Sequence, residues 1–244
     1  MNTQVIAHRG NSSVAPENTM AAFESAWRAG ADVIELDIQL TADGQAVVIH
    51  NDTLDATTDA TGPVSTRTAA ELGEVDAGSW FAPSFTGQRL PLLRDVLSWL
   101  RERDGLGLLV EFKGEWDPAP VSTVVEQIED AGVGGRIVVQ SFAVSTVRAL
   151  ADVAPDLRRG LLIDSLAEDT FSLCAQLRVA QCNPSGLILM EHPETLQLIQ
   201  DRGMQAMVWT VNEVAHWDAL LQMGADGIIT DRPDRLRGYL AGRT

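Results

Sequence analysis

Short apolar runs alternate with amphipathic stretches of helical length along almost the whole chain. The runs, which are rich in β-branched residues, predict strands at 4–7, 33–38, 107–113, 136–140, 158–163, 185–190, 204–210 and 226–230. The stretches between them predict helices at 19–29, 92–103, 119–131, 144–153, 166–178, 193–202, 213–223 and 232–241. Eight strands that are each followed by a helix, within 244 residues, are typical of the (β/α)8 TIM barrel, an α/β fold.

The segment 33–50, VIELDIQLTADGQAVVIH, predicts a strand, a tight turn and a returning strand. Asp43 and Gly44 are a strong signal for a two-residue hairpin loop. With that loop, Asp37 on the outgoing arm is expected to lie opposite His50 on the returning arm. No helix separates the two arms, so we assign the returning arm to a hairpin on strand two and not to a ninth barrel strand.

The region 51–91 departs from this rhythm, because it is rich in Thr, Gly, Pro and Asp and has little periodicity. We expect a single domain over 1–244, with a subdomain inserted at about 51–91. Such an insertion after strand two would emerge at the C-terminal mouth of the barrel, where active sites form. The aromatic residues Trp80, Phe81 and Phe85 could cap the mouth or pack on the barrel, and packing is favoured.

The formal net charge of −16 argues against a nucleic-acid partner and against a polybasic membrane anchor. No signal peptide or apolar run of about 18 residues is visible, which predicts a cytoplasmic protein without stable membrane anchoring. Cys174 and Cys182 have neither zinc-site nor redox-motif spacing, and we expect two partly buried thiols and not a disulfide. The oligomeric state stays open.

Three acidic residues are expected to converge at the mouth. Glu35 and Asp37 are two residues apart on one strand and therefore share a face, and Glu111 ends the next barrel strand. A hard divalent cation with oxygen ligands would relieve their repulsion. Ion pairs with Arg9 and Lys113 are the alternative, but two cations do not balance three acids. The sequence therefore favours a metal site.

His8 and His50 are also expected at strand ends that face the acids, where imidazoles suit an acid and base pair. Arg9 offers a bidentate fork and Lys113 a point charge for a phosphate oxygen. This combination suits phosphoryl transfer, and a phosphodiester fits best because its alkoxide leaving group needs a proton. His192 and His216 are more consistent with surface or packing positions.

An ordered set of short motifs runs through nearly the whole chain. It comprises His8-Arg9-Gly10, Glu17-Asn18-Thr19, Glu35-Leu36-Asp37, Thr41 with Asp43-Gly44, His50, Thr57-Thr58, Glu71-Leu72, Asp76-Ala77-Gly78, Trp80-Phe81, Glu111-Phe112-Lys113, Ser141-Phe142, Trp209-Thr210-Val211-Asn212 and Gly227-Ile228-Ile229-Thr230-Asp231-Arg232-Pro233. In order and spacing this set resembles the glycerophosphodiester phosphodiesterase family. The resemblance implies a TIM barrel that hydrolyses glycerophosphodiesters to glycerol 3-phosphate and an alcohol.

The same resemblance implies roles for individual residues. His8 and His50 match the family's catalytic acid/base pair. Glu35, Asp37 and Glu111 match the family's metal ligands, for one divalent cation, Mg²⁺ or Ca²⁺. The substrate-binding positions match Arg9, Lys113 and Trp209, and Glu17 belongs to the first mouth loop, where it supports the site.

The chain departs from the family pattern at two positions. Asn51 follows His50 where the family often has Asp, and Ala56 stands where it often has Arg. These departures bear on loop anchoring and head-group preference. Which histidine is the acid, and whether water or a glycerol hydroxyl attacks, stay open.

Two other functions fit parts of the pattern. A phospholipase D-like enzyme acting on lysophospholipid or sphingomyelin would need an apolar groove, and 51–91 has no obvious apolar run. A non-catalytic barrel that binds phosphorylated metabolites would usually lack a histidine or a metal ligand. None is missing here.

Overall fold

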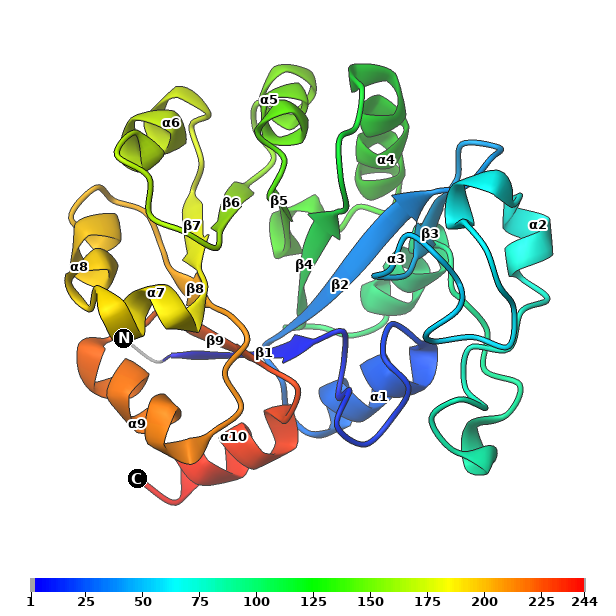
Figure 1. Ribbon diagram of the computed structural model, residues 1–244, viewed down its shortest axis with the longest axis horizontal. Coiled ribbons are helices and arrows are strands. Elements are labelled where there is room, and N and C mark those ends of the chain that lie inside the picture. The colour runs from blue at the N-terminus through cyan, green and yellow to red at the C-terminus, as the bar shows by residue number, and fades with distance from the viewer. Residues whose placement is uncertain (1–2, 244) are drawn as a thin grey trace.

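The computed structural model describes residues 3–243, and its centre is a ring of parallel strands (Figure 1). The described strands are β1 (Gln4–His8), β2 (Val33–Leu40), β3 (Ala46–Val48), β4 (Gly107–Phe112), β5 (Ile137–Ser141), β6 (Arg159–Ile163), β7 (Gln181–Pro184), β8 (Met207–Val208) and β9 (Gly227–Thr230). They are ordered β7-β6-β5-β4-β2-β1-β9-β8, with the antiparallel β3 paired to β2 off this path. The predicted TIM barrel is confirmed.

The ring closes where β7 meets β8, although the ladder there is interrupted. Two parallel bridges join the strands, Gln181 to Gln205 and Ser185 to Trp209. Between these bridges the side-chain oxygen of Asn183 accepts the main-chain N–H of Met207, at 3.0 Å. A side chain therefore takes the place of a main-chain carbonyl at the middle of this seam.

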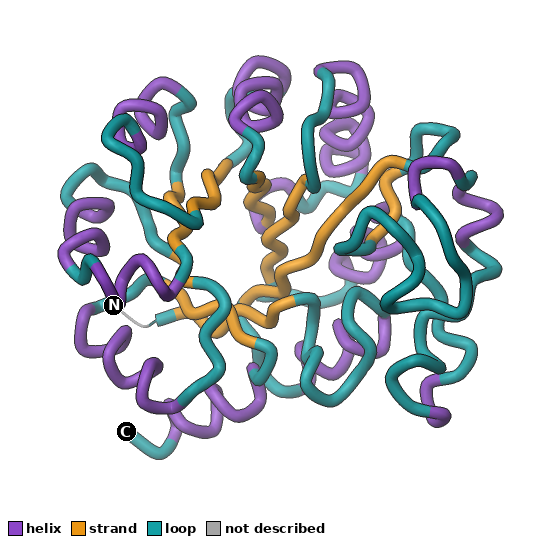
Figure 2. Tube along the Cα trace, viewed as in Figure 1, coloured by secondary structure: helices purple, strands orange, loops and turns teal. Residues whose placement is uncertain are grey.

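Helices surround the strands on the outside of the ring (Figure 2). They are α1 (Met20–Arg28), α2 (Ala69–Leu72), α3 (Leu93–Arg101), α4 (Pro118–Asp130), α5 (Val144–Val153), α6 (Thr170–Gln176), α7 (Gly186–Glu191), α8 (Glu194–Gln200), α9 (Val214–Met223) and α10 (Pro233–Ala241). The helix α3 shows why they pack: its buried residues, Leu93, Val96, Leu97 and Leu100, recur at helical spacing on one face. Within residues 3–243, no helix combines the length and apolar character needed to cross a membrane.

Two large apolar clusters fill the space between strands and helices, one in each half of the barrel. A smaller apolar cluster takes one residue from each of β1, β4, β8 and β9. These residues are Ile6, Leu109, Met207 and Ile229. Cys174 and Cys182 are free thiols, as expected, and they are fully buried where partial burial was predicted.

The hairpin of β2 and β3 is shifted by one residue from the prediction. Thr41 and Gln45 face each other across the turn, with the N–H of Thr41 donating to the carbonyl of Gln45 at 2.9 Å. The loop therefore holds one residue more than predicted, and the Thr41 hydroxyl stabilises it by accepting the N–H of Gln45 at 2.9 Å. Asp37 consequently bonds to Ile49, whose N–H donates to its carbonyl at 3.0 Å. The prediction that Asp37 lies opposite His50 is wrong.

The strand predicted at 185–190 is also wrong, because this segment forms α7 and the barrel strand is β7, just before it. A short apolar run does not distinguish a buried strand from a short helix. The hydroxyl of Ser185 accepts the N–H of Leu187 at 3.2 Å and starts the helix. Leu187 and Met190, three residues apart, are exposed at 70% and 64%, while Ile188 and Leu189 are buried. This pattern follows the helical repeat and not strand alternation.

The segment between β3 and α3 has a small core of its own. Its buried residues include Ile49, Leu54, Val64 and Leu72. Phe81 packs edge-on against both Trp80 and Phe85, and Trp80 remains 40% exposed. We infer that residues 51–91 form a subdomain of one domain and not a separate unit.

Candidate active site

Three buried carboxylates lie together at the C-terminal ends of β2 and β4. Asp37 and Glu111 are register partners across the two strands, and Glu35 lies two residues before Asp37 on the same face. The exposed fractions of Glu35, Asp37 and Glu111 are 2%, 1% and 7%. One oxygen from each lies within 4.8 Å of the others, a spacing that allows a shared metal ion.

Burial of these acids has a large electrostatic cost. It raises the pKa of Glu35 well above its ordinary value, and the negative charges of Asp37 and Glu111 raise it further. Burial and the charge of Asp37 also raise the pKa of Glu111 to about 7, against the opposing effect of Lys113. The cluster therefore holds protons or a cation at neutral pH. Its all-oxygen donor set fits a hard divalent ion.

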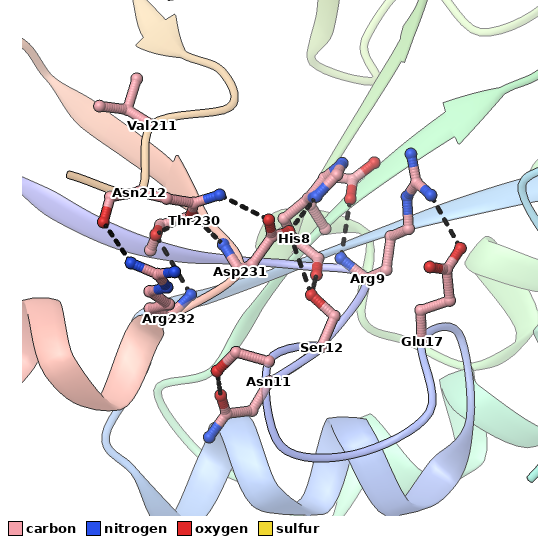
Figure 3. Close-up of polar contacts among 12 residues, drawn as sticks. His8, Arg9, Asn11, Ser12, Glu17, Val211, Asn212, Thr230, Asp231 and Arg232 are labelled. Carbon is pink, nitrogen blue, oxygen red and sulfur yellow. Dashed lines mark hydrogen bonds and ion pairs between the residues drawn. The ribbon is translucent and has the colours of Figure 1, made fainter. Parts of the chain in front are cut away.

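Arg9 joins the carboxylates through both its backbone and its side chain. Its φ of 55° turns the N–H toward Glu35, which accepts it at 3.0 Å. The guanidinium donates to Glu17 at 2.7 Å (Figure 3). Its Nε lies 3.3 Å from an oxygen of Asp37. Glu17 thus reaches the site through Arg9.

Gly10 makes the turn after β1 possible. Its φ is 86°, a conformation that L side chains rarely adopt, and a Cβ there would lie 2.7 Å from atoms of Ala22. The chain therefore needs glycine at this point to turn from β1 toward α1 with Arg9 pointing into the site.

Two further side chains contact the acidic cluster. The Nζ of Lys113 lies 2.8 Å from Glu111 and 3.8 Å from Asp37. The side chain of Asn18 donates to Asp37 at 2.9 Å. The ion pairs considered as an alternative to a metal are thus present, but they leave three carboxylates against two cations.

His8 ends β1 and is held by a residue from the far end of the chain. Its Nδ1 donates to Oδ1 of Asp231 at 2.6 Å (Figure 3). The side chain of Asn212 donates to Oδ2 of Asp231 at 2.6 Å, and the hydroxyl of Ser12 donates to Oδ1 at 3.1 Å. Burial raises the pKa of Asp231, but the hydrogen bonds and the charge of His8 bring it down to about 2. Asp231 is therefore ionised and orients His8.

Sequence reasoning did not assign this role to Asp231. The available signal was its position directly after β9, which ends at Thr230, with Asn212 shortly after β8. The contact spans 223 residues, so no local pattern relates its two partners.

His50 has a different partner. Its Nδ1 pairs with the side-chain oxygen of Asn51 at 2.8 Å, and its carbonyl accepts the side-chain N–H of Gln39 at 2.9 Å. Burial lowers the pKa of His50, and the positive charges of Arg9 and Lys113 lower it further, against the effect of Asp37. His50 is therefore mainly neutral at physiological pH.

The polar residues surround a cavity of about 110 Å³ whose opposite wall is aromatic. Trp209 forms that wall, with its indole N–H donating to the carbonyl of Asn183 at 2.8 Å and Phe142 edge-on at 5.3 Å. The cavity is lined by His8, Arg9, Glu35, His50, Glu111, Lys113, Gln140, Phe142, Leu162, Trp209, Thr210 and Ile229.

Comparison with known proteins gives consistent matches over the full barrel. Residues 8–235 match the model of the glycerophosphoryl diester phosphodiesterase family. A glycerophosphodiester phosphodiesterase of Caldanaerobacter subterraneus subsp. tengcongensis is 35% identical over 238 residues, which cover 97% of each chain. A glycerophosphodiester phosphodiesterase of Bacillus altitudinis is 32% identical over 235 residues, which cover 96% of each chain.

Solved structures agree with these sequences. A glycerophosphodiester phosphodiesterase of Agrobacterium tumefaciens superposes with a TM-score of 0.86 at 32% identity, covering 97% of this chain and 100% of that one. An Oleispira antarctica phosphodiesterase, solved in complex with the product sn-glycerol-3-phosphate, superposes with a TM-score of 0.92 at 25% identity. That match covers 98% of this chain and 96% of the other.

Proposed function

Because this chain belongs to the glycerophosphoryl diester phosphodiesterase family, we propose that it cleaves glycerophosphodiesters with a divalent cation and two histidine proton carriers. The chain is a phosphoric diester hydrolase with glycerophosphodiester phosphodiesterase activity, and its substrate is a small molecule. Its products are glycerol 3-phosphate and an alcohol.

The cation binds Glu35, Asp37 and Glu111, and it is Mg²⁺ or Ca²⁺. A divalent ion at this position supplies a Lewis acid that offsets negative charge on the phosphate oxygens. The buried acidic cluster is the single observation that carries this proposal, since three carboxylates this close together need a counter-charge beyond Arg9 and Lys113.

Arg9 and Lys113 bind the phosphate from the polar side of the cavity. Both cations are already held by carboxylates, so their orientation is fixed before the substrate arrives. Preorganised donors of this kind stabilise charge that develops in the transition state more effectively than water does. Trp209 forms the opposite wall.

His8 and His50 carry the protons. The ionised Asp231 beside His8 offsets a positive charge on that imidazole, which suits a group that starts protonated. His50 has only a neutral amide partner and a lowered pKa, which suits a group that starts neutral. We therefore assign His8 as the general acid for the leaving alkoxide and His50 as the general base for the nucleophile, either water or a glycerol hydroxyl.

Chelation tests the metal proposal. Treatment with EDTA is expected to abolish release of glycerol 3-phosphate from glycerophosphoglycerol, and Mg²⁺ or Ca²⁺ restores it. Glu111→Gln needs more cation for half-activation, whereas the exposed Glu115→Gln serves as a matched control that does not. Full activity after chelation contradicts metal dependence, while absence of product under every condition contradicts the function itself.

A further inference from the structure

An apolar groove of about 440 Å³ runs between α7, α9 and the end of β8. It is lined by Ser185, Gly186, Leu187, Leu189, Met190, Trp209, Thr210, Val211, His216, Ala219, Leu220 and Met223. Among the residues that the structure describes, this lining contains no Asp, Glu, Lys or Arg, although the chain has a net charge of −16. The groove is therefore an apolar strip on an acidic protein.

The helix α7 exposes large apolar side chains to solvent. Leu187 and Met190 are the two most exposed large hydrophobic residues described, at 70% and 64%. Leu189 in the same helix is buried and anchors it to the barrel. Contiguous exposed apolar residues of this kind commonly mark a binding surface.

The groove adjoins the catalytic cavity. Trp209 and Thr210 line both spaces, so the indole ring divides the cavity from the groove. The ring is held in place by the carbonyl of Asn183 and by the edge-on contact with Phe142. A molecule with its phosphate beside Arg9 can therefore extend past Trp209 into the groove.

The two walls of the cavity favour different halves of a phosphodiester. The polar wall of Arg9 and Lys113 offers hydrogen-bond partners for glycerol hydroxyls. The Trp209 indole N–H is already bonded to a carbonyl, and the Phe142 ring beside it has no hydrogen-bonding group. The glycerol half therefore belongs on the polar side, and the alcohol half points toward Trp209.

We propose that this groove binds an apolar chain on the alcohol half of the substrate. The preferred substrates are then glycerophosphodiesters whose alcohol carries an unbranched apolar chain. This inference rests on the proposed function and extends it by naming a substrate class. A lipid bilayer is a poorer occupant, because the acidic protein is repelled by anionic membranes.

A chain-length series tests the inference. The substrates are glycerophospho-n-alkanols with chains of one to about eight carbons, kept below their micelle concentrations. Burial of each methylene is expected to raise kcat/KM roughly threefold to fourfold until the groove is filled. A flat series overturns the inference, and activity on glycerophosphoglycerol in the same assay shows that the proposed function still stands. Absence of activity on every substrate instead contradicts the proposed function.

Variants in α7 test where the apolar chain of the substrate binds. Leu187→Asp and Met190→Asp are expected to lower the ratio of kcat/KM for the octyl over the methyl substrate by roughly tenfold or more. Both positions are exposed, so thermal unfolding should stay near that of the parent chain. Leu166→Asp, exposed but outside the groove, is the matched control and should keep the parent ratio. A change confined to Leu166→Asp overturns the inference.

A second series separates the two halves of the substrate. Lysophosphatidylcholines carry their chain on the glycerol side, and their kcat/KM should show less dependence on chain length than that of the alkanol series. Stronger dependence in the lysophosphatidylcholine series overturns the assignment of the alcohol half to the groove.

Discussion

Nδ1 of His8 lies 2.6 Å from Oδ1 of Asp231, although 223 residues separate the two in the sequence. One residue ends the first strand of the barrel and the other directly follows the last. Parallel pairing of β1 with β9 brings both to the same edge of the ring. The orientation of His8, which we propose as a proton carrier, therefore depends on the pairing of the first and last strands.

Asp231→Asn tests this dependence. The amide has an N–H that can donate to His8 Nδ1, which favours the wrong tautomer and removes the negative charge beside the ring. We expect kcat to fall by roughly 10² to 10⁴, by analogy with the loss seen when a catalytic histidine loses its carboxylate partner. Steady-state kinetics measure the loss. Asp234→Asn, an exposed residue in the first turn of α10, should leave kcat unchanged. Equal kcat in both variants refutes a positioning role for Asp231.

Leaving-group chemistry separates His8 from His50. A p-nitrophenolate leaving group needs no proton, so it bypasses the general acid. His8→Ala should lose about 10³-fold or more in kcat with glycerophosphoglycerol but far less with the p-nitrophenyl ester. His50→Ala should lose activity on both substrates.

The exposed His192→Ala is the control, because that side chain pairs only with Glu194 at 3.4 Å among the described salt bridges. If His50→Ala and not His8→Ala retains p-nitrophenyl ester hydrolysis, the two histidines have the opposite roles.

The raised pKa values at Glu35 and Glu111 predict how metal binding varies with pH. Their pKa values in the folded protein lie above the ordinary value of 4.5, with Glu111 at about 7. The folded state therefore binds more protons than the unfolded state in this range. The free energy of unfolding of the metal-free protein falls as the pH rises from 4.5 through about 7. A cation must displace the protons, so it should raise Tm more at about pH 8 than at about pH 5.5.

Thermal unfolding with and without saturating Mg²⁺ or Ca²⁺ measures the Tm shift at each pH. Each kcal/mol by which the cation stabilises the folded protein should raise Tm by roughly 2–4 °C. Glu111→Gln should reduce the pH dependence of the shift. An equal Tm shift at both pH values is incompatible with protonated carboxyls in the metal-free cluster.

Gly10→Ala is expected to destabilise the protein strongly. The new methyl group meets Ala22 at 2.7 Å while φ stays near 86°, so overlap adds to conformational strain. We expect a loss of about 3 kcal/mol or more in the free energy of unfolding. Gly44→Ala is a matched control, since its φ is 74° and nothing lies within 4 Å of the new Cβ. That variant should lose only about 1–2 kcal/mol, the cost of the left-handed conformation alone. Equal losses in denaturant titrations rule out the overlap with Ala22.

Much of the barrel could be predicted because its signals are local. Helix α5 begins and ends where periodicity places it, and the convergence of Glu35, Asp37 and Glu111 follows from strand alternation and neighbouring strands. The turn after β2 was misread because a Thr41 hydroxyl stabilises a longer loop than Asp43 and Gly44 alone indicate. His50 reaches the cavity even so, because it lies just beyond the end of β3.

Other features were hidden because they depend on tertiary contacts. The apolar run 185–190 looks the same as a buried strand until its neighbours are known, and its exposed side is what forms the groove. The pairing of His8 with Asp231 requires knowing that the first and last strands meet.

One residue in the seam between β7 and β8, Asn183, contributes both to the closure of the barrel and to the wall of the catalytic cavity. Asn183 closes the ring by accepting the N–H of Met207, and its carbonyl also holds the indole of Trp209. A substitution of Asn183 therefore affects both the closure of the ring and the position of the Trp209 indole. We expect few residues to be tolerated at this position. Leu187 and Met190 are exposed and do not take part in ring closure. We therefore expect that substitutions there can change the preference for the alcohol without disturbing the barrel.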